Sequence, residues 1–308
     1  MRTGKVKSLA VGVAAGLAAI GVLGPAGVAA QAPAQPAPAP PAEAKGPNTG
    51  RVSLSAGIDY ATDYYFRGIL QEDTDYIFQP YGEVTFKLYE GQQTLNAVGF
   101  TLGTWNSLHG GPTGVDGPNV DPKLWYESDF YAKISTTWFE DFTAGFVYTA
   151  YMSPNDRFAT VQEVALSFGY NDAKLLGPFA LNPTLLVAFE TKGQADAGQD
   201  KGVYMQIGLT PAVTFFEKSE YPLTLSFPLL LGLSLADYYE FGTGDDDTFG
   251  FFQGGVAASV PLKFIPADFG AWQVKASLNW LHLGDNLKAI NNSDRDEIIA
   301  TFGIAFTY

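Results

Sequence analysis

The sequence contains no cysteine, and among its 308 residues there are only two histidines and three methionines. Without cysteine the chain forms no disulfide and no thiolate metal site, and thiol redox chemistry is excluded. His109 and His282 are too few for a histidine cluster, neither belongs to a known motif, and we interpret both as surface residues. No phosphate-binding loop is present. The sequence therefore predicts no cofactor and no metal site.

Long hydrophobic runs are equally scarce. One apolar run, Leu9–Leu23, follows three basic residues and ends just before Pro25. This order is typical of a secretory signal peptide, and the run is shorter than the roughly 20 apolar residues that a membrane-spanning helix requires. We therefore predict a signal peptide at residues 1–30. The Pro/Ala-rich segment that follows, residues 31–50, is predicted to be a disordered periplasmic spacer.

Basic residues are fewer than acidic ones. The chain has 18 Lys and Arg against 32 Asp and Glu, for a formal net charge of −14. Removing the three basic residues of the signal from the 18 leaves 15 against 32, which is a formal charge of −17. Such a charge disfavours nucleic acid and anionic surfaces as partners and favours cations.

What the sequence does contain, beyond residue 50, is alternation of apolar with small or polar residues, which indicates β-strands. Aromatic residues make up 14% of the chain, and there are 34 glycines. We count about twelve strands, at Arg51–Arg67, Tyr76–Tyr89, Thr94–Asn106, Leu124–Phe139, Phe142–Met152, Thr160–Tyr170, Leu181–Glu190, Val203–Phe216, Leu223–Tyr238, Phe249–Leu262, Trp272–His282 and Ile298–Tyr308.

These strands are longer than the five or six residues that are usual in a soluble protein, and most reach the roughly 9–11 needed to cross a bilayer. We therefore predict an all-β fold for residues 51–308, a transmembrane antiparallel up-and-down β-barrel of about twelve strands. The alternative is a soluble two-sheet sandwich. An even strand number places both termini on the periplasmic side, with short periplasmic turns and longer polar outer loops such as Gln71–Asp75.

Aromatic residues near strand ends are predicted to form girdles at the two membrane interfaces. They are Tyr60, Tyr64, Phe66, Trp138, Tyr148, Tyr238, Trp272 and Trp280. The last strand also carries Thr301, Gly303, Phe306 and Tyr308 in a spacing that resembles the terminal signal of bacterial outer-membrane barrels. That resemblance implies that the outer-membrane assembly machinery is a partner.

Two stretches resemble the signature sequences of a family. Residues 63–71 read Asp-Tyr-Tyr-Phe-Arg-Gly-Ile-Leu-Gln, and residues 103–107 read Gly-Thr-Trp-Asn-Ser. They are similar to Asp-Tyr-x-Phe-Arg-Gly-Ile-Ser-Gln and Gly-x-Trp-x-Ser of the TorF family of proposed porins, with Leu70 in place of the serine. The match covers the first three strands, and the rest of the chain agrees with the family only in length and in the spacing of its strands and loops. The resemblance implies an outer-membrane barrel and says little about its solute.

The side chains predicted to face the lumen carry most of the charge in the strands. They are Asp59, Asp63, Arg67, Glu83, Lys87, Glu127, Asp129, Lys133, Glu163, Glu190 and Lys275. Apart from Asp63 and Arg67, six are carboxylates and three are lysines. A wet lumen would relieve the cost of burying such charges, and the acidic excess would favour cations. Twelve strands enclose a lumen narrower than that of general porins.

Arg67 cannot pair with Asp63 on the same strand, because residues four apart are separated by about 13 Å. It therefore requires a carboxylate across the barrel or in a loop. Either it fixes a loop or it takes part in ion selection. Gly68, which follows it, would permit a turn.

We interpret the chain as a bacterial outer-membrane porin for small cationic or neutral solutes, with no chemistry of its own. Its partners would be the lipid bilayer, the assembly machinery and the solutes, and not nucleic acid. A non-conducting structural or adhesive barrel is the alternative, and fully paired inward charges in a plugged lumen would favour it. An outer-membrane lipid hydrolase using Ser and His is a further alternative, which a Ser–His contact at the lipid-facing rim would favour.

Overall fold

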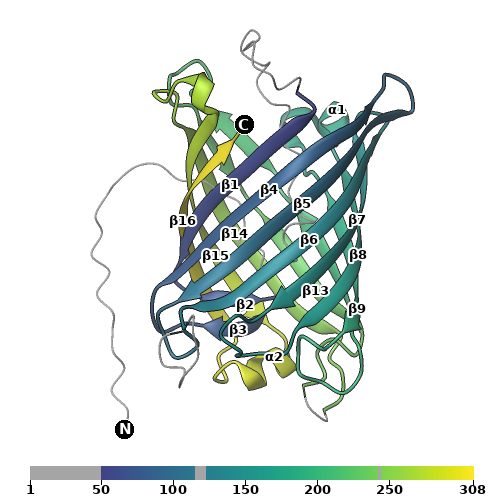
Figure 1. Cartoon of the computed structure of the whole chain (residues 1–308), viewed down its shortest axis with the longest axis vertical. Helices are drawn as coiled ribbons and strands as arrows, with labels where there is room; N and C mark the ends of the chain where they lie inside the picture. The colour runs from purple at the N-terminus through teal and green to yellow at the C-terminus, as the bar shows by residue number, and fades with distance from the viewer. Residues whose placement is uncertain (1–49, 115–122, 242–243) are drawn as a thin grey trace.

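The computed structural model describes residues 50–114, 123–241 and 244–308 (Figure 1). The predicted signal peptide and all but the last residue of the predicted spacer lie outside these ranges. No helix in the described ranges is long and apolar enough to cross a membrane.

All described strands except two, β2 (Tyr64–Phe66) and β3 (Ile69–Glu72), form one closed antiparallel sheet. Its wall strands are β1 (Val52–Ala61), β4 (Ile77–Glu90), β5 (Leu95–His109), β6 (Trp125–Trp138), β7 (Phe142–Met152), β8 (Val161–Tyr170), β9 (Thr184–Lys192), β10 (Val203–Leu209) with β11 (Ala212–Phe215), β12 (Leu223–Ser226) with β13 (Leu229–Ala236), β14 (Phe249–Pro261), β15 (Ala271–Leu283) and β16 (Asp296–Thr307). Each pairs with its neighbours in sequence, and β16 pairs with β1 to close the barrel.

Two of the twelve wall strands are interrupted by proline. Pro211 lies between β10 and β11, and Pro228 lies between β12 and β13. Proline has no backbone N–H to contribute to the ladder, so each strand is divided there, although β10 pairs with β13 and β11 with β12. Counting each divided strand once gives twelve, and the predicted all-β, twelve-stranded up-and-down barrel is confirmed.

The outer face of the wall is apolar, as the alternation predicts. Phe130 on β6 is 55% exposed and Phe302 on β16 is 57% exposed, whereas their strand neighbours Asp129 and Thr301 are buried. One surface of the barrel therefore presents large apolar side chains, and the other encloses polar ones. This division suits a wall with lipid on the outside.

The first strand ends earlier than predicted. β1 stops at Ala61, and the chain then forms a hairpin of β2 (Tyr64–Phe66) and β3 (Ile69–Glu72) that pair only with each other. In Figure 1 this hairpin lies at the end of the barrel away from the C-terminus. The predicted strand through Arg67 is therefore wrong, as is the interpretation of Gln71–Asp75 as wholly an outer loop. We call residues 64–72 the hairpin plug.

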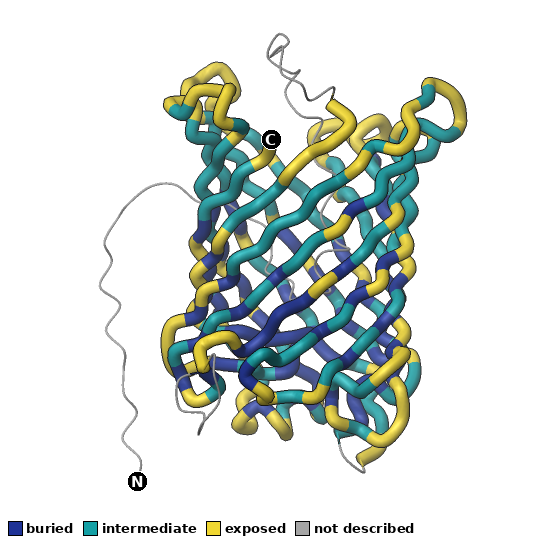
Figure 2. Tube along the Cα trace, viewed as in Figure 1, coloured by how far each residue is buried: buried dark blue, intermediate teal, exposed yellow. Residues whose placement is uncertain are grey.

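Burial differs between the two ends of the barrel. We call the end where Val52 and Thr307 lie the terminus end, and the opposite end the loop end. Figure 2 shows buried residues concentrated toward the loop end, around the hairpin plug. The short helices are α1 (Ala173–Leu176), η2 (Gly177–Phe179) and η3 (Ala267–Phe269) at the terminus end and α2 (Asp285–Ile290) at the loop end.

Three residues predicted for the aromatic girdles are in this buried core instead. Tyr64, Phe66 and Tyr238 are at most 7% exposed, so their assignment to a lipid interface is wrong. Tyr60 and Tyr148, in contrast, are exposed on wall strands. The difference follows from the hairpin plug, which removes Tyr64 and Phe66 from the wall, and from Tyr238, which lies beyond the end of β13.

Candidate functional site

The turn of the hairpin plug is formed by Arg67 and Gly68. Phe66 pairs with Ile69, so the turn has two residues, and both have positive φ, +48° and +86°. This is the conformation of a tight hairpin turn that matches the twist of its strands, and glycine in the second position accepts it without strain. The predicted turn at Gly68 is thus present, but it directs the chain into the lumen rather than outward.

Arg67 joins the tip of the plug to the barrel wall. Its two terminal nitrogens donate to the two carboxylate oxygens of Glu163 on β8, at 3.0 and 2.6 Å. Arg67 also donates to the Tyr238 hydroxyl at 2.7 Å, and its guanidinium carbon lies 4.1 Å from the ring centre of Tyr204. Burial alone would lower the pKa of Arg67, but Glu163 and the tyrosines raise it well above its usual value. The expected distant carboxylate is therefore Glu163, and Arg67 fixes the plug.

Further hydrogen bonds fix the backbone of the plug. The Asn291 side chain, just after α2, donates to the Gly68 carbonyl at 2.6 Å and accepts from the Leu70 N–H at 2.9 Å. The Tyr239 hydroxyl donates to the Arg67 carbonyl at 3.0 Å. Leu70, which replaces the serine of the TorF motif, packs against the buried cluster that contains Leu287. The turn is therefore held from two different loops.

Aromatic side chains fill the space between the plug and the wall. Tyr64 lies 5.3 Å from Trp105 on β5, and Phe66 lies 5.3 Å from Tyr151 on β7, as ring-centre distances. All four side chains are buried. The plug thus combines one ion pair with substantial apolar contact, and it obstructs the lumen at the loop end.

Two carboxylates on β6 stand apart from these pairs. Glu127 and Asp129 face inward from alternate positions and are 3% and 0% exposed. The Tyr64 hydroxyl donates to Glu127 at 2.9 Å, and the carboxyl groups of Glu127 and Asp129 hydrogen-bond to each other, whereas no other described group donates to Asp129. Neither residue forms an ion pair within the described ranges. Two acidic groups are therefore buried together without a protein cation.

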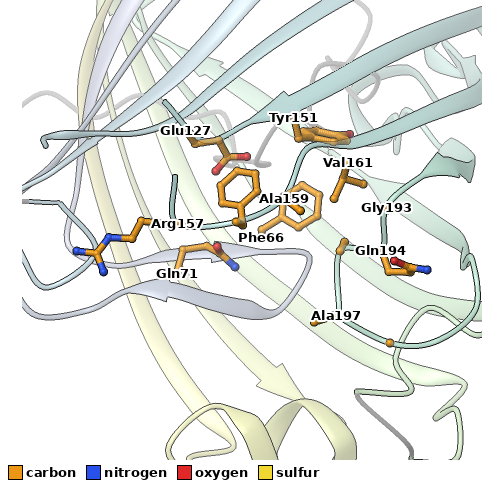
Figure 3. Close-up of a pocket in the computed structure, with 13 residues that line it drawn as sticks. Phe66, Gln71, Glu127, Tyr151, Arg157, Ala159, Val161, Gly193, Gln194 and Ala197 are labelled. Atoms are coloured by element: carbon orange, nitrogen blue, oxygen red, sulfur yellow. The ribbon is translucent and has the colours of Figure 1, made fainter. Parts of the chain in front are cut away.

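A cavity of about 430 Å³ lies beside the plug at the loop end. Its wall includes Phe66 of the plug, Glu127 of β6 and Tyr151 of β7. Figure 3 shows the Glu127 carboxylate directed toward the plug side of the cavity, while the Arg157 guanidinium points away from it. Arg157 itself is exposed, so the mouth of the cavity meets solvent. The site therefore places a carboxylate among aromatic side chains within reach of the outside.

A separate chain of hydrogen bonds begins at Ser107. Its hydroxyl lies 2.7 Å from His109 Nε2, His109 Nδ1 lies 2.7 Å from the Thr113 hydroxyl, and Thr113 donates to Glu72 in the plug. His109 also stacks on Tyr126. The expectation that His109 is a surface residue is wrong, because it is the last residue of β5 and fully buried. The Ser–His contact lies on the inner wall and not on a lipid-facing rim.

Four predicted lumen charges lie nearer the terminus end, where Glu83 and Lys133 are half-buried and Asp59 and Lys275 are buried. Lys275 donates to Asp59 at 2.7 Å across the strands β15, β16 and β1. Glu83 accepts from the Tyr131 hydroxyl at 3.0 Å, and Lys133 lies half-buried on the same wall. The lumen here is lined mainly by small hydroxyl and glycine residues, including Thr85, Thr101, Ser135, Thr143, Gly145, Ser167, Gly169 and Thr184.

The remaining predicted residues occupy varied places. Glu190 accepts the backbone N–H groups of Ala195 and Gly202, at 2.6 and 2.8 Å, and so anchors a loop. Lys87 pairs with Glu90 at 3.3 Å on the exposed terminus end. Asp63 is half-buried between β1 and β2.

In the predicted assembly signal, Thr301 and Gly303 face the lumen. Phe306 lies on the outer side, with its ring 4.9 Å from that of Trp272, and Tyr308 is exposed at the end of the chain. A side chain at Gly303 would collide with the Asp59 carboxylate and lie 2.8 Å from the Ile58 carbonyl. The glycine of this motif therefore has a packing role beside the Asp59–Lys275 pair.

The site also contains residues that the sequence did not indicate. Tyr151, Tyr204, Tyr238 and Asn291 all contact the ion pair or the turn of the plug. For Tyr151 and Tyr204 a signal existed, because both occupy inward positions of strands whose outward positions are apolar or aromatic. Tyr238 and Asn291 lie in loops, where alternation gives no information.

No family model matches the sequence, and no curated protein matches it. Solved structures with a similar fold include the COG4313 outer membrane channel from Pseudomonas putida F1, with a TM-score of 0.44 at 11% identity over 88% of this chain and 100% of that chain. LpxR from Salmonella typhimurium has a TM-score of 0.43 at 9% identity, over 82% and 99%. The NanC porin has a TM-score of 0.39 at 12% identity, over 82% and 98%. At these values the likenesses say nothing of what this chain does.

Proposed function

We propose that the chain is a bacterial outer-membrane channel for small cationic or neutral solutes, and that the described state is closed at the loop end by the hairpin plug. The observation that carries the proposal is the pair Glu127 and Asp129. In a barrel whose interior serves only stability, two carboxyl groups buried together would be expected to have a cationic partner or to be absent, since taking acidic groups out of water is costly. A site that admits water and cations relieves that cost.

The rest of the lumen supports the same interpretation. Toward the terminus end the inner wall carries hydroxyl, glycine and charged side chains rather than packed aliphatic ones. The resemblance of residues 63–71 to the TorF motif also points to an outer-membrane porin, and in this chain that motif forms the plug. We infer that opening consists of movement of the hairpin plug away from Glu163, because this removes the obstruction without separating any wall strands.

The plug equally favours a second function, that of a non-conducting structural barrel. Its aromatic packing and the Arg67–Glu163 pair are what such a protein would need. The two functions differ in whether the plug moves. The lipid hydrolase alternative draws only on the Ser107–His109 contact, and both side chains are fully buried on the inner wall.

Single-channel recording of the refolded protein in a planar bilayer distinguishes these functions. The chain has no cysteine, so Phe66→Cys and Tyr151→Cys introduce a unique thiol pair between plug and wall. We expect discrete current steps that disappear when a short thiol cross-linker joins the pair. The single variant Phe66→Cys is the matched control and should keep conducting in the presence of the cross-linker. A silent bilayer containing a correctly folded barrel would reject the channel and leave the structural function.

A further inference from the structure

The cavity beside the plug combines a buried acidic group with aromatic walls. Glu127 lies on one side of it, and Phe66, Tyr151 and Phe158 contribute rings. Its volume of about 430 Å³ is within the usual range of about 300–1,000 Å³ for small-molecule sites. Because the loops that form its mouth are exposed, a solute can reach it from the loop end without passing the plug.

The charge of the cavity is not balanced by the protein. The buried cation of the plug, Arg67, gives both terminal nitrogens to Glu163, and the Arg157 guanidinium points away from the cavity. Behind Glu127, Asp129 is fully buried and hydrogen-bonds to it, and no described cation pairs with either carboxyl group. A ligand that supplies a cation at Glu127 would take the place of the proton that the two carboxyl groups share.

The surroundings favour an organic cation over a metal ion. Within the described ranges no three His, Cys, Asp or Glu side chains are placed to hold a metal. An ammonium group, in contrast, needs one or two carboxylates and gains from aromatic faces. An apolar body attached to it would lie against Phe66, Phe158 and Val161, which line the same cavity.

We propose that this cavity binds a small organic cation, with its ammonium group at Glu127 and its apolar body among the aromatic rings. The inference rests on the proposed function and names a class of solute for it. A bound solute would lie against Phe66 and Tyr151, the two rings through which the plug contacts the wall. The cavity is therefore a recognition site at the entrance to the lumen.

Calorimetric titration of the refolded full barrel in detergent micelles tests this, with phenethylammonium as the probe and 2-phenylethanol as its neutral counterpart. We expect saturable binding of the amine and at least tenfold weaker binding of the alcohol. Glu127→Gln should weaken amine binding at least tenfold while keeping the acceptor for Tyr64. The matched control is Glu83→Gln, an inward carboxylate outside the cavity, which should bind the amine like the unmodified protein.

If Glu127→Gln does not fold, as judged by heat-dependent gel mobility, Phe158→Ala provides a second variant in an outer loop, and we expect it to weaken binding several-fold. Equal binding of amine and alcohol, no binding of the amine, or equal amine binding by Glu127→Gln or Phe158→Ala and the unmodified protein would overturn the inference. The titration involves no ion flow. A barrel that conducts without binding the amine overturns this inference alone, and one that binds without conducting overturns the channel alone.

Discussion

Replacing Arg67 by methionine should release the hairpin plug without unfolding the barrel. Arg67 and Glu163 form a buried ion pair, with side chains 2% and 3% exposed. Methionine retains length and apolar contact but leaves the Glu163 carboxylate buried, with only the Tyr151 hydroxyl donating to it at 2.7 Å. The substitution therefore weakens the docking of the plug and not the wall, because the wall hydrogen bonds on either side of Glu163 remain.

The expected magnitude follows from the burial of the pair. Removing one partner of a buried ion pair costs about 3–5 kcal/mol, which shifts an equilibrium by about two to nearly four powers of ten. Trp105 reports the change, since its ring lies 5.3 Å from that of Tyr64 in the plug. We expect acrylamide to quench Trp105 fluorescence more strongly in Arg67→Met. A parallel measurement on Trp105→Phe subtracts the other four tryptophans.

Two further variants make the result decisive. In the double variant Arg67→Met with Glu163→Gln the unpaired charge is gone, so quenching should return most of the way to that of the unmodified protein. Lys87→Met removes a cation from the exposed pair with Glu90, which contributes about 0–1 kcal/mol, and should leave quenching unchanged. If Arg67→Met were quenched no more than Lys87→Met, the plug would not depend on its ion pair and the reasoning would fail.

Three other predictions concern the plug and the closing strand. Gly68→Ala places a side chain at φ +86°, which costs about 1–2 kcal/mol, and should also increase Trp105 quenching; unchanged quenching would contradict the assigned turn. Gly303→Ala should lower the free energy of unfolding in urea by about 1–3 kcal/mol because of its collision with Asp59, and an unchanged midpoint would show that the strands adapt. For Glu72, burial would raise the pKa, but hydrogen bonds from two threonines outweigh it and lower the pKa. The Thr113 N–H also donates to Glu72, at 3.4 Å. Protection of this amide from hydrogen exchange should therefore be present above the unfolded pKa of Glu72 and lost as pH falls through the lower folded pKa. Protection that persists at pH 3, or that survives Glu72→Gln at neutral pH, would refute this.

The wall could be predicted from the sequence because lipid and lumen impose a period of two on every strand. Thus Asp129 and Thr301 lie inside, and Phe130 and Phe302 lie outside, as the alternation indicates. The strand count was also predictable, since turns separate the runs. Pro211 and Pro228 divide two strands without changing which side chains face inward.

The plug could not be predicted from the same pattern. Tyr64 and Phe66 continue the alternation of β1, so the two-residue periodicity alone predicts that the strand continues through Arg67. The informative residues were Arg67 and Gly68, a two-residue turn that returns the chain on itself. Whether such a hairpin points outward or into the lumen depends on Glu163, which is 96 residues away in the sequence. A contact at that separation has no local signal.

His109 shows a similar limit. Glycines follow it, which suggested a loop, whereas it completes the inward series of Trp105 and Ser107 on β5. Its burial depends on Tyr126 and Thr113, which belong to other segments. Alternation thus predicts the side of the wall on which a residue lies, but not what the lumen contains at that level.

We propose that ions pass a lumen whose selectivity comes from Glu127 and Asp129. The most direct measurement is the reversal potential of single channels across a tenfold salt gradient, for the unmodified protein and for Glu127→Gln with Asp129→Asn. We expect a cation-selective potential that moves toward zero in the double variant, while Glu83→Gln shifts it less. A reversal potential that is the same in the double variant, or that favours anions in the unmodified protein, would contradict it.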